Sequence, residues 1–405
     1  MDKIVIAGAG QAAIQSAVSL RKFGYEGSIT IIGEESHPPY QRPPLSKDYL
    51  LGKTQLDRVH LKKEAFYAEN KIELIINTKV ESIDRKEKMV SLSNKENLAY
   101  GKLIIAVGSR VRKLDVPGVN KNGIHYLRGL DDANSLKENL KEGKKLVIVG
   151  AGYIGLEVAA VAASLKIETS VIDIADRVMS RTVDPLISDY YHSLHANNGV
   201  NIHLKHGLKS ITGKGNVEKV FCTNNLELDA DIVVIGAGVI PNDELASTAG
   251  LTCENGIVVN EFGQTEDENI YACGDCTNHP NKILGRKLRL ESVHNAMEQS
   301  KVVASSIMGL EEPYNQVPWF WSDQFDLKLQ IAGLSDGYDD LVIRGDIKNS
   351  REFAAFYFKG DKLLAVDAVN SPREFMLGRM VLGKGKTLDK KAIADQSADL
   401  KTAII

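Results

Sequence analysis

Cysteine is scarce in this chain, and the first half of the sequence has none. The four cysteines are Cys222, Cys253, Cys273 and Cys276. Since none precedes Cys222, an enzyme that relays electrons through an N-terminal cysteine pair, such as a glutathione or coenzyme-A disulfide reductase, is disfavoured. Cys273 and Cys276 form a C-x-x-C pattern, but they end an expected strand instead of opening a helix. A redox dithiol or a metal site there is therefore the weaker alternative, and the spacing does not suggest an iron–sulfur cluster.

Long apolar runs and an excess of one charge are also missing. No run approaches the roughly 20 apolar residues that span a bilayer. The formal net charge of −3 gives no basic footprint for nucleic acid or an anionic membrane. An expected strand begins at Lys3, so we expect no secretory signal and a cytoplasmic protein. The 405 residues, 43% hydrophobic and 25% charged, predict a globular protein of two or three domains.

What the chain does have is a pair of glycine-rich turns of one type. They are Gly8-Ala9-Gly10-Gln11-Ala12-Ala13 and Gly150-Ala151-Gly152-Tyr153-Ile154-Gly155. Each follows a short β-branched run and opens an alanine-rich helical stretch. An acidic residue ends the next strand in both cases, Glu34 in the first and Asp173 in the second. One such motif is a weak signal, but two in the same context predict that the chain holds two dinucleotides.

The chemistry of a dinucleotide explains the residues of these turns. The diphosphate needs backbone N–H donors and the positive end of a helix. The first glycine (Gly8, Gly150) permits the tight turn, and the second (Gly10, Gly152) lets the backbone approach the phosphate. The third place, Ala13 in one copy and Gly155 in the other, sets how closely helix and strand pack, and the acid accepts hydrogen bonds from a ribose 2′-OH. Two such turns are typical of a flavin enzyme fed by a nicotinamide cofactor.

The remaining pattern predicts an α/β fold with two Rossmann-like dinucleotide-binding domains, for FAD and NAD, and a small C-terminal α+β domain. Short strands are predicted at 72–76, 80–84 and 89–92, weak antiparallel signals occupy 200–230, and the run 231–240 is typical of one buried parallel strand. Residues 353–358 and 363–369 alternate as a hairpin before a helix at about 372–382. The predicted domains are 1–112 with 242–317 for FAD, 113–241 for NADH, and 318–405.

Longer motifs carry a resemblance over essentially the whole chain. They are GAGQAA at 8–13, YQRPPLSK at 40–47, GAGYIGLEVAA at 150–160, IGAGVIPN at 235–242, YACGDC at 271–276, RLESVHNA at 289–296 and PWFWSDQ at 318–324. With them the chain resembles the FAD-dependent NADH:ferredoxin reductases of oxygenase systems, which have the two-dinucleotide fold of the glutathione-reductase type. The second and last motifs are more specific than the glycine turns, and they separate this group from the disulfide reductases.

The resemblance implies FAD and NADH as cofactors and no metal. It implies that a hydride passes from NADH to the flavin, and that electrons leave one at a time to an acidic [2Fe–2S] ferredoxin serving a cytochrome P450 or a Rieske oxygenase. Two departures from the family are visible: Ala106-Val107-Gly108 replaces its alanine-threonine-glycine turn, and His294 stands where relatives vary. Beyond the turn residues and their acids, the expected cofactor contacts are Ala12, Arg42, Pro44, Lys47, Val80, Ala106, Gly108, Arg128, Tyr153, Ile154, Gly238, Asp275, Ser292 and Val293.

Catalytic roles are expected for Lys47, Glu157, Glu291 and Trp321. Lys47 lies in a proline-stiffened loop, where a fixed ammonium would stabilise the negative charge that develops on a flavin during reduction; otherwise it is a solvated surface lysine. Glu157 would pair with Lys47 near the meeting point of the two cofactors, or be a solvated helix glutamate. Glu291 would accept a hydrogen bond from the nicotinamide carboxamide. Trp321 would shield the flavin, or be a core aromatic.

Two further side chains bear on cofactor binding and cofactor choice. Asp275, at the C-terminal end of an expected strand, would bind the ribityl chain of FAD or cap the next helix. The carboxylate of Asp173 fits a free 2′-OH and would repel a 2′-phosphate, and Arg177 beside it is a poor phosphate clamp, so the sequence favours NADH over NADPH.

The expected partner is the acidic [2Fe–2S] ferredoxin, which would bind only transiently. The enzyme itself is expected to be a monomer or a weak dimer. An acidic ferredoxin calls for a basic docking face, for which 286–289 and 42–47 are candidates, although charge runs are usually only solvated surface. Three alternatives stay open on the same scaffold: a rubredoxin reductase, an NADH oxidase, and an apoptosis-inducing-factor-like redox-sensing protein. Targeting segments and basic surfaces, expected of the last, are not apparent in the sequence.

Overall fold

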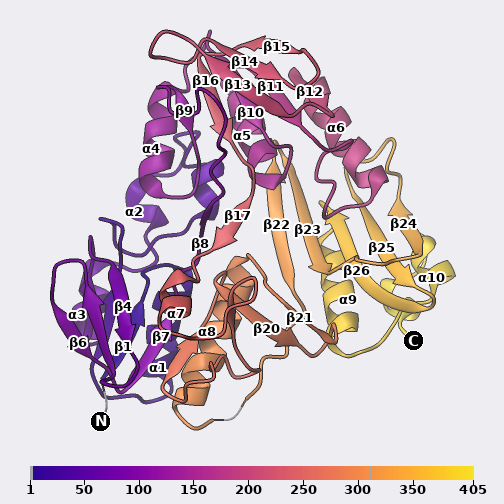
Figure 1. The fold of residues 1–405 in the computed structure, drawn as a ribbon. Coiled ribbons are helices and arrows are strands. Elements are labelled where there is room, and N and C mark those ends of the chain that lie inside the picture. Colours follow the sequence, from indigo (N-terminus) through magenta and orange to yellow (C-terminus); the bar gives the residue numbers. More distant parts are fainter. Residues whose placement is uncertain (1–2, 311) are drawn as a thin grey trace. The chain divides into compact units, whose positions relative to one another are not determined.

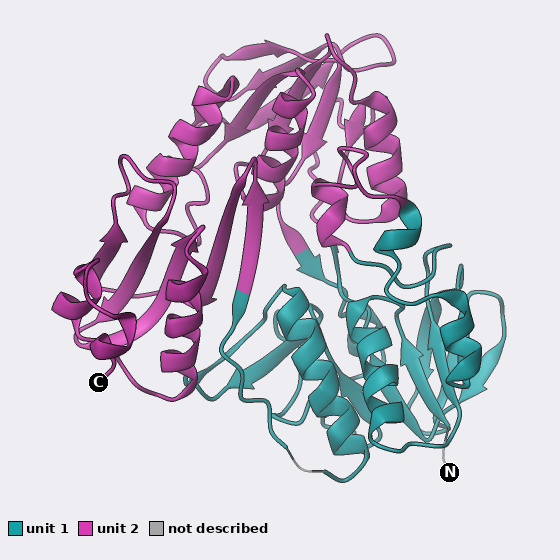
Figure 2. Cartoon of the chain, turned by 180° about the vertical axis from the view of Figure 1, so that it is seen from behind, with its two compact units in different colours: residues 1–41, 56–110, 240–319 teal, residues 42–55, 111–239, 320–405 magenta. Residues whose placement is uncertain are grey.

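The computed structural model describes residues 3–310 and 312–405, which form two compact units (Figure 1, Figure 2). Unit 1 comprises 1–41, 56–110 and 240–319, and unit 2 comprises 42–55, 111–239 and 320–405. Each unit contains one of the two glycine-rich turns. The predicted fold class, two dinucleotide-binding α/β regions with a small C-terminal α+β region, is confirmed.

Unit 1 is built on a five-stranded parallel sheet in the order β19-β7-β1-β2-β3. Its strands are β1 (Ile4–Ala7), β2 (Ile29–Ile32), β3 (Ile72–Ile75), β7 (Lys102–Ile105) and β19 (Ile270–Ala272). β1 and β2 are buried over their whole length, as strands covered on both faces should be. Helices α1 (Gln11–Lys22) and α8 (Val293–Ile307) pack on one another beside this sheet.

Smaller elements complete unit 1. Two three-stranded sheets follow the orders β4-β5-β6 and β18-β20-β21. Their strands are β4 (Val80–Asp84), β5 (Met89–Leu92), β6 (Asn97–Ala99), β18 (Ile257–Val258), β20 (Thr277–Asn281) and β21 (Arg286–Leu288), and the short helices are α2 (Leu56–Val59), α3 (Glu64–Glu69) and α7 (Glu244–Thr248). A two-stranded ribbon of β8 (Ser109–Val111) and β17 (Val239–Pro241) lies where the chain passes from one unit to the other.

Unit 2 repeats the parallel architecture with the order β12-β11-β10-β16-β9. The strands are β9 (Ile124–His125), β10 (Lys145–Val149), β11 (Glu168–Asp173), β12 (Val200–Leu204) and β16 (Ile232–Ile235). The accompanying helices are η1 (Pro43–Ser46), α4 (Leu130–Asn139), α5 (Tyr153–Ser164) and α6 (Pro185–Asn197). An antiparallel sheet of β13 (Leu208–Thr212), β14 (Lys219–Cys222) and β15 (Glu227–Asp229) adjoins it.

The C-terminal part of unit 2 is a five-stranded sheet in the order β22-β23-β26-β25-β24, in which β23, β26, β25 and β24 pair antiparallel. The strands are β22 (Trp319–Gln324), β23 (Leu327–Gly333), β24 (Asp340–Gly345), β25 (Phe353–Lys359) and β26 (Lys362–Val369), followed by α9 (Pro372–Gly383), α10 (Lys390–Ala394) and η2 (Leu400–Ala403). Helix α9 packs on β26 and β23. The predicted hairpin and the helix after it are confirmed almost to the residue.

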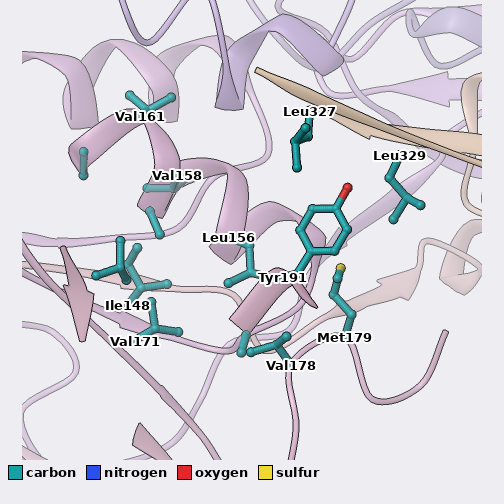
Figure 3. Close-up of a cluster of buried hydrophobic side chains, with 14 of the residues drawn as sticks. Ile148, Leu156, Val158, Val161, Val171, Val178, Met179, Tyr191, Leu327 and Leu329 are labelled. Carbon is teal, nitrogen blue, oxygen red and sulfur yellow. The ribbon is translucent and has the colours of Figure 1, made fainter. Parts of the chain in front are cut away.

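One hydrophobic core joins the two sheets of unit 2. Tyr191 of α6, fully buried, lies beside Leu327 and Leu329 of β23 and Met179, while Leu156 and Val158 of α5 belong to the same cluster (Figure 3). Leu50 also belongs to this core, and the Tyr49 hydroxyl donates to Asn134 Oδ1 at 2.6 Å. These contacts explain why residues 42–55 pack with unit 2 although they were expected within the stretch 1–112.

Two strand predictions were wrong. The run 231–240 is not one strand: β16 ends at Ile235, and β17 begins at Val239 in a different sheet. Gly238, with φ +91°, breaks the run between them, because a positive φ cannot continue a strand. The predicted antiparallel stretch 200–230 begins with β12, which pairs parallel to β11. The strands predicted at 80–84 and 89–92 have the observed bounds.

Candidate functional site

The first glycine-rich turn joins β1 to α1 in unit 1. Gly8 has φ +111°, and a Cβ placed there would lie 2.3 Å from the carbonyl oxygen of Ala106. Only glycine fits such a position, because the conformation and the space both exclude a side chain. A Cβ on Gly10, in contrast, would meet nothing within 4 Å. The backbone at Gly10, which caps α1, is therefore open to a ligand.

The second turn joins β10 to α5 in unit 2 and repeats this geometry. Gly150 has φ +112°, and a Cβ there would lie 2.4 Å from the carbonyl oxygen of Gly236. Gly152 caps α5 with open space around it. A Cβ on Gly155 would lie 2.0 Å from the carbonyl oxygen of Gly150, whereas Ala13, its counterpart in unit 1, is accommodated and fully buried. The third place is thus tighter in the second turn.

Both helices begin without the groups that normally satisfy a helix N-terminus. Neither Gly10 nor Gly152 has a side chain that could cap, and neither α1 nor α5 has an acidic residue in its first turn. The first N–H groups of a helix and its dipole favour an anion there. Since the approach is also open, the residues present fit the diphosphate of a dinucleotide at both turns.

The two acids that follow the turns differ in their surroundings. The Glu34 side chain is 71% exposed, and Lys79 Nζ lies 3.9 Å from its Oε1. Asp173 is half-buried, and its carboxylate accepts hydrogen bonds from the backbone N–H of Ala151 at 2.6 Å and of Ala175 at 2.8 Å. These bonds tie Asp173 to the glycine-rich turn while leaving lone pairs for a ribose hydroxyl.

The arginine beside Asp173 is committed elsewhere. Arg177 donates through Nη1 to the carbonyl of Val183 and through Nη2 to that of Ser180, both at 2.6 Å. A guanidinium held by two carbonyls is poorly placed to clamp a 2′-phosphate. This geometry supports the preference for NADH.

Lys47 and Glu157 meet inside unit 2. Lys47 Nζ lies 2.9 Å from Oε2 of Glu157, whose side chain is only 2% exposed. The Ser46 hydroxyl donates to Oε2 at 2.5 Å and the Ser322 hydroxyl to Oε1 at 2.7 Å. Burial raises the pKa of Glu157, and Lys47 and the two hydroxyls oppose that rise. Glu157 is therefore not the solvated helix glutamate that the sequence left open.

Asp275 and the two nearby cysteines lie at the end of β19 in unit 1. The Ser109 hydroxyl donates to Asp275 Oδ2 at 3.0 Å. Cys273 and Cys276 are buried free thiols, and burial raises the pKa of both. A buried thiol held neutral is a poor nucleophile, so the geometry gives no support to a redox dithiol.

The other expected residues have varied positions. Arg42 Nη1 donates to the backbone carbonyl of Arg128 at 2.7 Å, so two of them meet. Glu291 is exposed and pairs with Arg289. Ser292 caps α8 through a bond from the N–H of Asn295, and Val293 begins that helix.

The remaining positions can be described from burial and backbone. Trp321 is half-buried on β22, and Tyr153 packs edge-to-face on Phe320 with ring centroids 4.8 Å apart. The other expected cofactor contacts lie in or beside the ends of secondary-structure elements. Ile154, near the start of α5, is 47% exposed. The rest are Pro44 in η1, Val80 at the start of β4, Ala106 and Gly108 after β7, and Gly238 before β17.

Sequence reasoning missed several polar residues of this site. Ser46 and Ser322 belong to the two most specific motifs but were given no role, and Gln324 and His195, which continue from Ser322, were not singled out. The signal for Ser322 and Gln324 was their alternate placement, on the same face as Phe320, in the strand sequence Trp-Phe-Trp-Ser-Asp-Gln. Among residues 3–310 and 312–405, no group of His, Cys, Asp and Glu side chains is arranged to hold a metal ion, and no helix is long and apolar enough to cross a membrane.

Two nucleotide-type turns, each opening a helix that has no side-chain cap, define a dinucleotide-binding oxidoreductase. The model of the pyridine nucleotide-disulphide oxidoreductase family matches residues 2–300, and a reductase C-terminal model matches 319–404. The chain belongs to this family.

Particular relatives narrow the comparison. The chain is 42% identical to rhodocoxin reductase of Rhodococcus erythropolis, over 99% of this chain and 94% of that protein. It is 40% identical to a rubredoxin–NAD(+) reductase of Pseudomonas putida, over 91% of this chain and 96% of that protein. Its structure is similar to that of putidaredoxin reductase in the covalent putidaredoxin reductase–putidaredoxin complex, with a TM-score of 0.97, 38% identity, and 99% and 98% of the two chains covered.

Proposed function

We propose that this protein is a cytoplasmic FAD enzyme that oxidises NADH and delivers electrons one at a time to an acidic [2Fe–2S] ferredoxin, feeding a cytochrome P450 or a Rieske oxygenase. The observation that carries the proposal is the pair of open glycine-rich turns, at Gly8–Gly10 and Gly150–Gly152. FAD and NADH, when bound, supply the redox chemistry. The cytoplasm is proposed because that compartment holds the NADH pool.

The residues of the chain would bind and orient these cofactors. The N–H groups at Gly10 and Gly152 would hold the two diphosphates, and Glu34 and Asp173 would accept from ribose hydroxyls. By this proposal residues 1–112 and 242–317 bind FAD, residues 113–241 bind NADH, and residues 318–405 form the C-terminal domain. Asp275 would bind the ribityl chain.

The remaining contacts with FAD and NADH rest on the family resemblance. They are assigned to Ala12, Arg42, Pro44, Val80, Ala106, Gly108, Arg128, Tyr153, Ile154, Gly238, Ser292 and Val293.

Catalysis would depend on charge and shielding more than on a nucleophile. Lys47 would stabilise negative charge on the flavin, and Glu157 would hold the Lys47 ammonium in place. Glu291 would orient the nicotinamide carboxamide, and Trp321 would exclude water. Buried, neutral cysteine thiols are consistent with a route that needs no thiol relay.

The stretches 286–289 and 42–47 are each a candidate basic docking surface for the ferredoxin. Within 286–289, Arg286 and Lys287 are exposed, and Arg289 pairs with Glu291. An acidic ferredoxin would be steered by such charges, and salt would weaken the association.

The test begins with the visible spectrum of the purified protein, which should show bound flavin. Anaerobic NADH should bleach it rapidly, and NADPH far less efficiently. Cytochrome c reduction should then require an added [2Fe–2S] ferredoxin and fall as salt rises. A colourless protein that takes up no FAD would overturn the proposal.

A parallel arm separates the other enzymes on this scaffold. Rubredoxin is the main competitor, because a rubredoxin reductase is among the relatives. Faster electron transfer to rubredoxin than to every ferredoxin tried would change the assigned partner. Rapid NADH consumption without a protein acceptor would indicate an oxidase, and slow flavin reduction with a long-lived charge-transfer band would indicate a sensor.

A further inference from the structure

A row of buried polar side chains runs from helix α6 to Glu157 within unit 2. His195 Nε2 lies 2.8 Å from Gln324 Oε1, Gln324 Nε2 lies 3.1 Å from Ser322 Oγ, and Ser322 Oγ lies 2.7 Å from Glu157 Oε1. His195, Gln324 and Ser322 are fully buried. The row thus joins two helices through one strand, and it ends on the carboxylate that pairs with Lys47.

The hydrogen bonds of this row all point the same way. An amide oxygen can only accept, so His195 must carry its proton on Nε2 and donate to Gln324. The amide N–H of Gln324 then donates to Ser322 Oγ, which leaves the single hydroxyl proton of Ser322 for Glu157. Burial lowers the pKa of His195 to about 4, so its ring stays neutral near pH 7 and can hold this tautomer.

Strand β22 explains why these side chains are together. Successive residues of a strand face opposite sides, so Phe320, Ser322 and Gln324 share one face. Phe320 packs on Tyr153 of α5, one turn before Glu157. The same strand face therefore supplies an aromatic contact to the start of α5 and then two polar contacts. Fully buried polar groups destabilise a core unless they are paired, so their presence on a core strand calls for a role.

We propose that Ser322, oriented by Gln324 and His195, is a positioning residue that holds Glu157 as an ionised carboxylate aimed at Lys47. The inference rests on the proposed function, in which Lys47 and Glu157 act together. Three donors face the carboxylate: the ammonium of Lys47 and the hydroxyls of Ser46 and Ser322. Without Ser322, one carboxylate oxygen would lose its hydrogen bond in a buried place, and protonation of Glu157 would become easier.

Other titratable groups near Glu157 do not replace this donor. Lys47 faces it from the residue after η1, and the buried phenol of Tyr153 lies on the same helix. His195 is reached only through Gln324 and Ser322. The acid limb of the pH–rate profile should accordingly report the protonation of Glu157.

The experiment measures NADH-driven ferredoxin reduction from pH 5 to 9 in wild type, Ser322→Ala and Ser322→Thr. Ser322→Ala should move the acid limb up by about one pH unit, so that the rate at the wild-type midpoint falls several-fold. Ser322→Thr keeps the hydroxyl on a strand residue and should restore the wild-type limb. The matched control is Ser188→Ala, because Ser188 is also fully buried in unit 2 but donates to the backbone carbonyl of Val178.

A double-mutant cycle separates positioning from general stability. In a Glu157→Gln background, where no carboxylate remains to be ionised, Ser322→Ala should have no further effect on the profile. An equal effect in both backgrounds, or a limb in Ser322→Ala that superimposes on wild type, would overturn the inference. Should Ser322→Ala fail to fold, Gln324→Met serves instead. The acid limb of this variant should also move to higher pH, but by less. An acid limb that coincides with that of wild type would count against the inference.

Failure of this inference can be told from failure of the proposed function. If the wild-type protein binds no flavin or reduces no acceptor, the proposed function is wrong. If it does both, but Glu157→Gln has the wild-type profile, the enzyme assignment stands and the positioning role of Ser322 falls.

Discussion

The two units share an architecture but bury different kinds of polar group. Each has a five-stranded parallel sheet and a glycine-rich turn. Among the described residues, the buried Asp, Glu and Arg side chains all belong to unit 2: Glu157, Asp184, Arg344 and Asp367.

In unit 1, neutral buried side chains make the hydrogen bonds between helix α8 and the end of strand β19. The Ser300 hydroxyl lies 3.4 Å from Cys273 Sγ, and Gln299 Oε1 accepts from the N–H of Gly274 at 2.8 Å and from the Thr277 hydroxyl at 2.9 Å. These bonds tie α8 to the turn after β19. Because such groups do not change charge near neutral pH, they hold this turn in the same way across the working range.

The charged groups of unit 2 serve several ends. Glu157 meets Lys47, while the Arg344 guanidinium donates to backbone carbonyls of the C-terminal segment, among them Ile393 and Ala398. Asp367 accepts from the Tyr357 hydroxyl at 2.5 Å, and that oxygen accepts from the N–H of Asp184 at 3.1 Å. The comparison teaches that similar sheets can be completed either by pH-independent or by pH-dependent bonds.

The largest difference between the two units is expected at the third position of their glycine-rich turns, Ala13 in unit 1 and Gly155 in unit 2. Gly155→Ala should lower stability by about 3 kcal/mol, because its Cβ would lie 2.0 Å from the carbonyl oxygen of Gly150. The reverse change in unit 1, Ala13→Gly, should lower it by about 1 kcal/mol through helix propensity. Thermal unfolding measures the loss of stability in both variants. A loss in Gly155→Ala no larger than that in Ala13→Gly would contradict the tighter third position of the second turn.

The second test concerns the pH dependence of stability. Burial raises the pKa of Asp367 to about 7, above its value in an unfolded chain. Between about pH 4 and 7 the folded protein therefore keeps a proton that the unfolded chain has lost, and stability falls as pH rises through this window. Asp367→Asn removes that slope. Wild type should therefore lose about 3 kcal/mol of stability relative to Asp367→Asn between pH 4.5 and 7.5, seen as a rising Tm of the variant relative to wild type.

The control for this test comes from unit 1. Cys273→Ser replaces one neutral buried group by another, so its Tm difference from wild type should be the same at both pH values. A Tm difference for Asp367→Asn that also stays constant would contradict the contrast drawn between the units.

A third test sharpens the difference between Asp173 and Glu34. Asp173→Asn should lower kcat/KM for NADH about tenfold, and should narrow the preference over NADPH because a negative charge facing a 2′-phosphate is removed. Glu34→Gln should weaken FAD binding and leave the coenzyme preference unchanged. Steady-state kinetics with both coenzymes and flavin titration of the apoprotein distinguish the effects of the two variants. If Glu34→Gln altered the coenzyme preference, the first turn would bind NADH and the second FAD, the reverse of the proposed assignment.

The smallest effect is expected in unit 1. Cys273→Ser/Cys276→Ser should keep ferredoxin reduction within about twofold of wild type, since buried neutral thiols do not react. The assay is run at equal bound flavin. Lost electron transfer with flavin still bound would mean that the C-x-x-C pair carries electrons.

Much of this could be predicted from local sequence. The two turns, the strands of 80–84 and 89–92 and the C-terminal hairpin follow from patterns within a few residues. The split of 231–240 was missed because the apolar run hides the positive φ of Gly238. The Ser322–Gln324–His195 row was missed because it depends on β22 packing against α5 and α6, which no local pattern encodes.

The path of the backbone through unit 1 has a consequence of its own. The N–H of Asn242 donates to the carbonyl of Gly108 at 3.0 Å, so the places where the chain leaves and re-enters this unit are neighbours. Seen from unit 1, the long excursion through 111–239 is a loop whose ends already meet. At such a junction a domain can be inserted or replaced during evolution while the fold of unit 1 is kept.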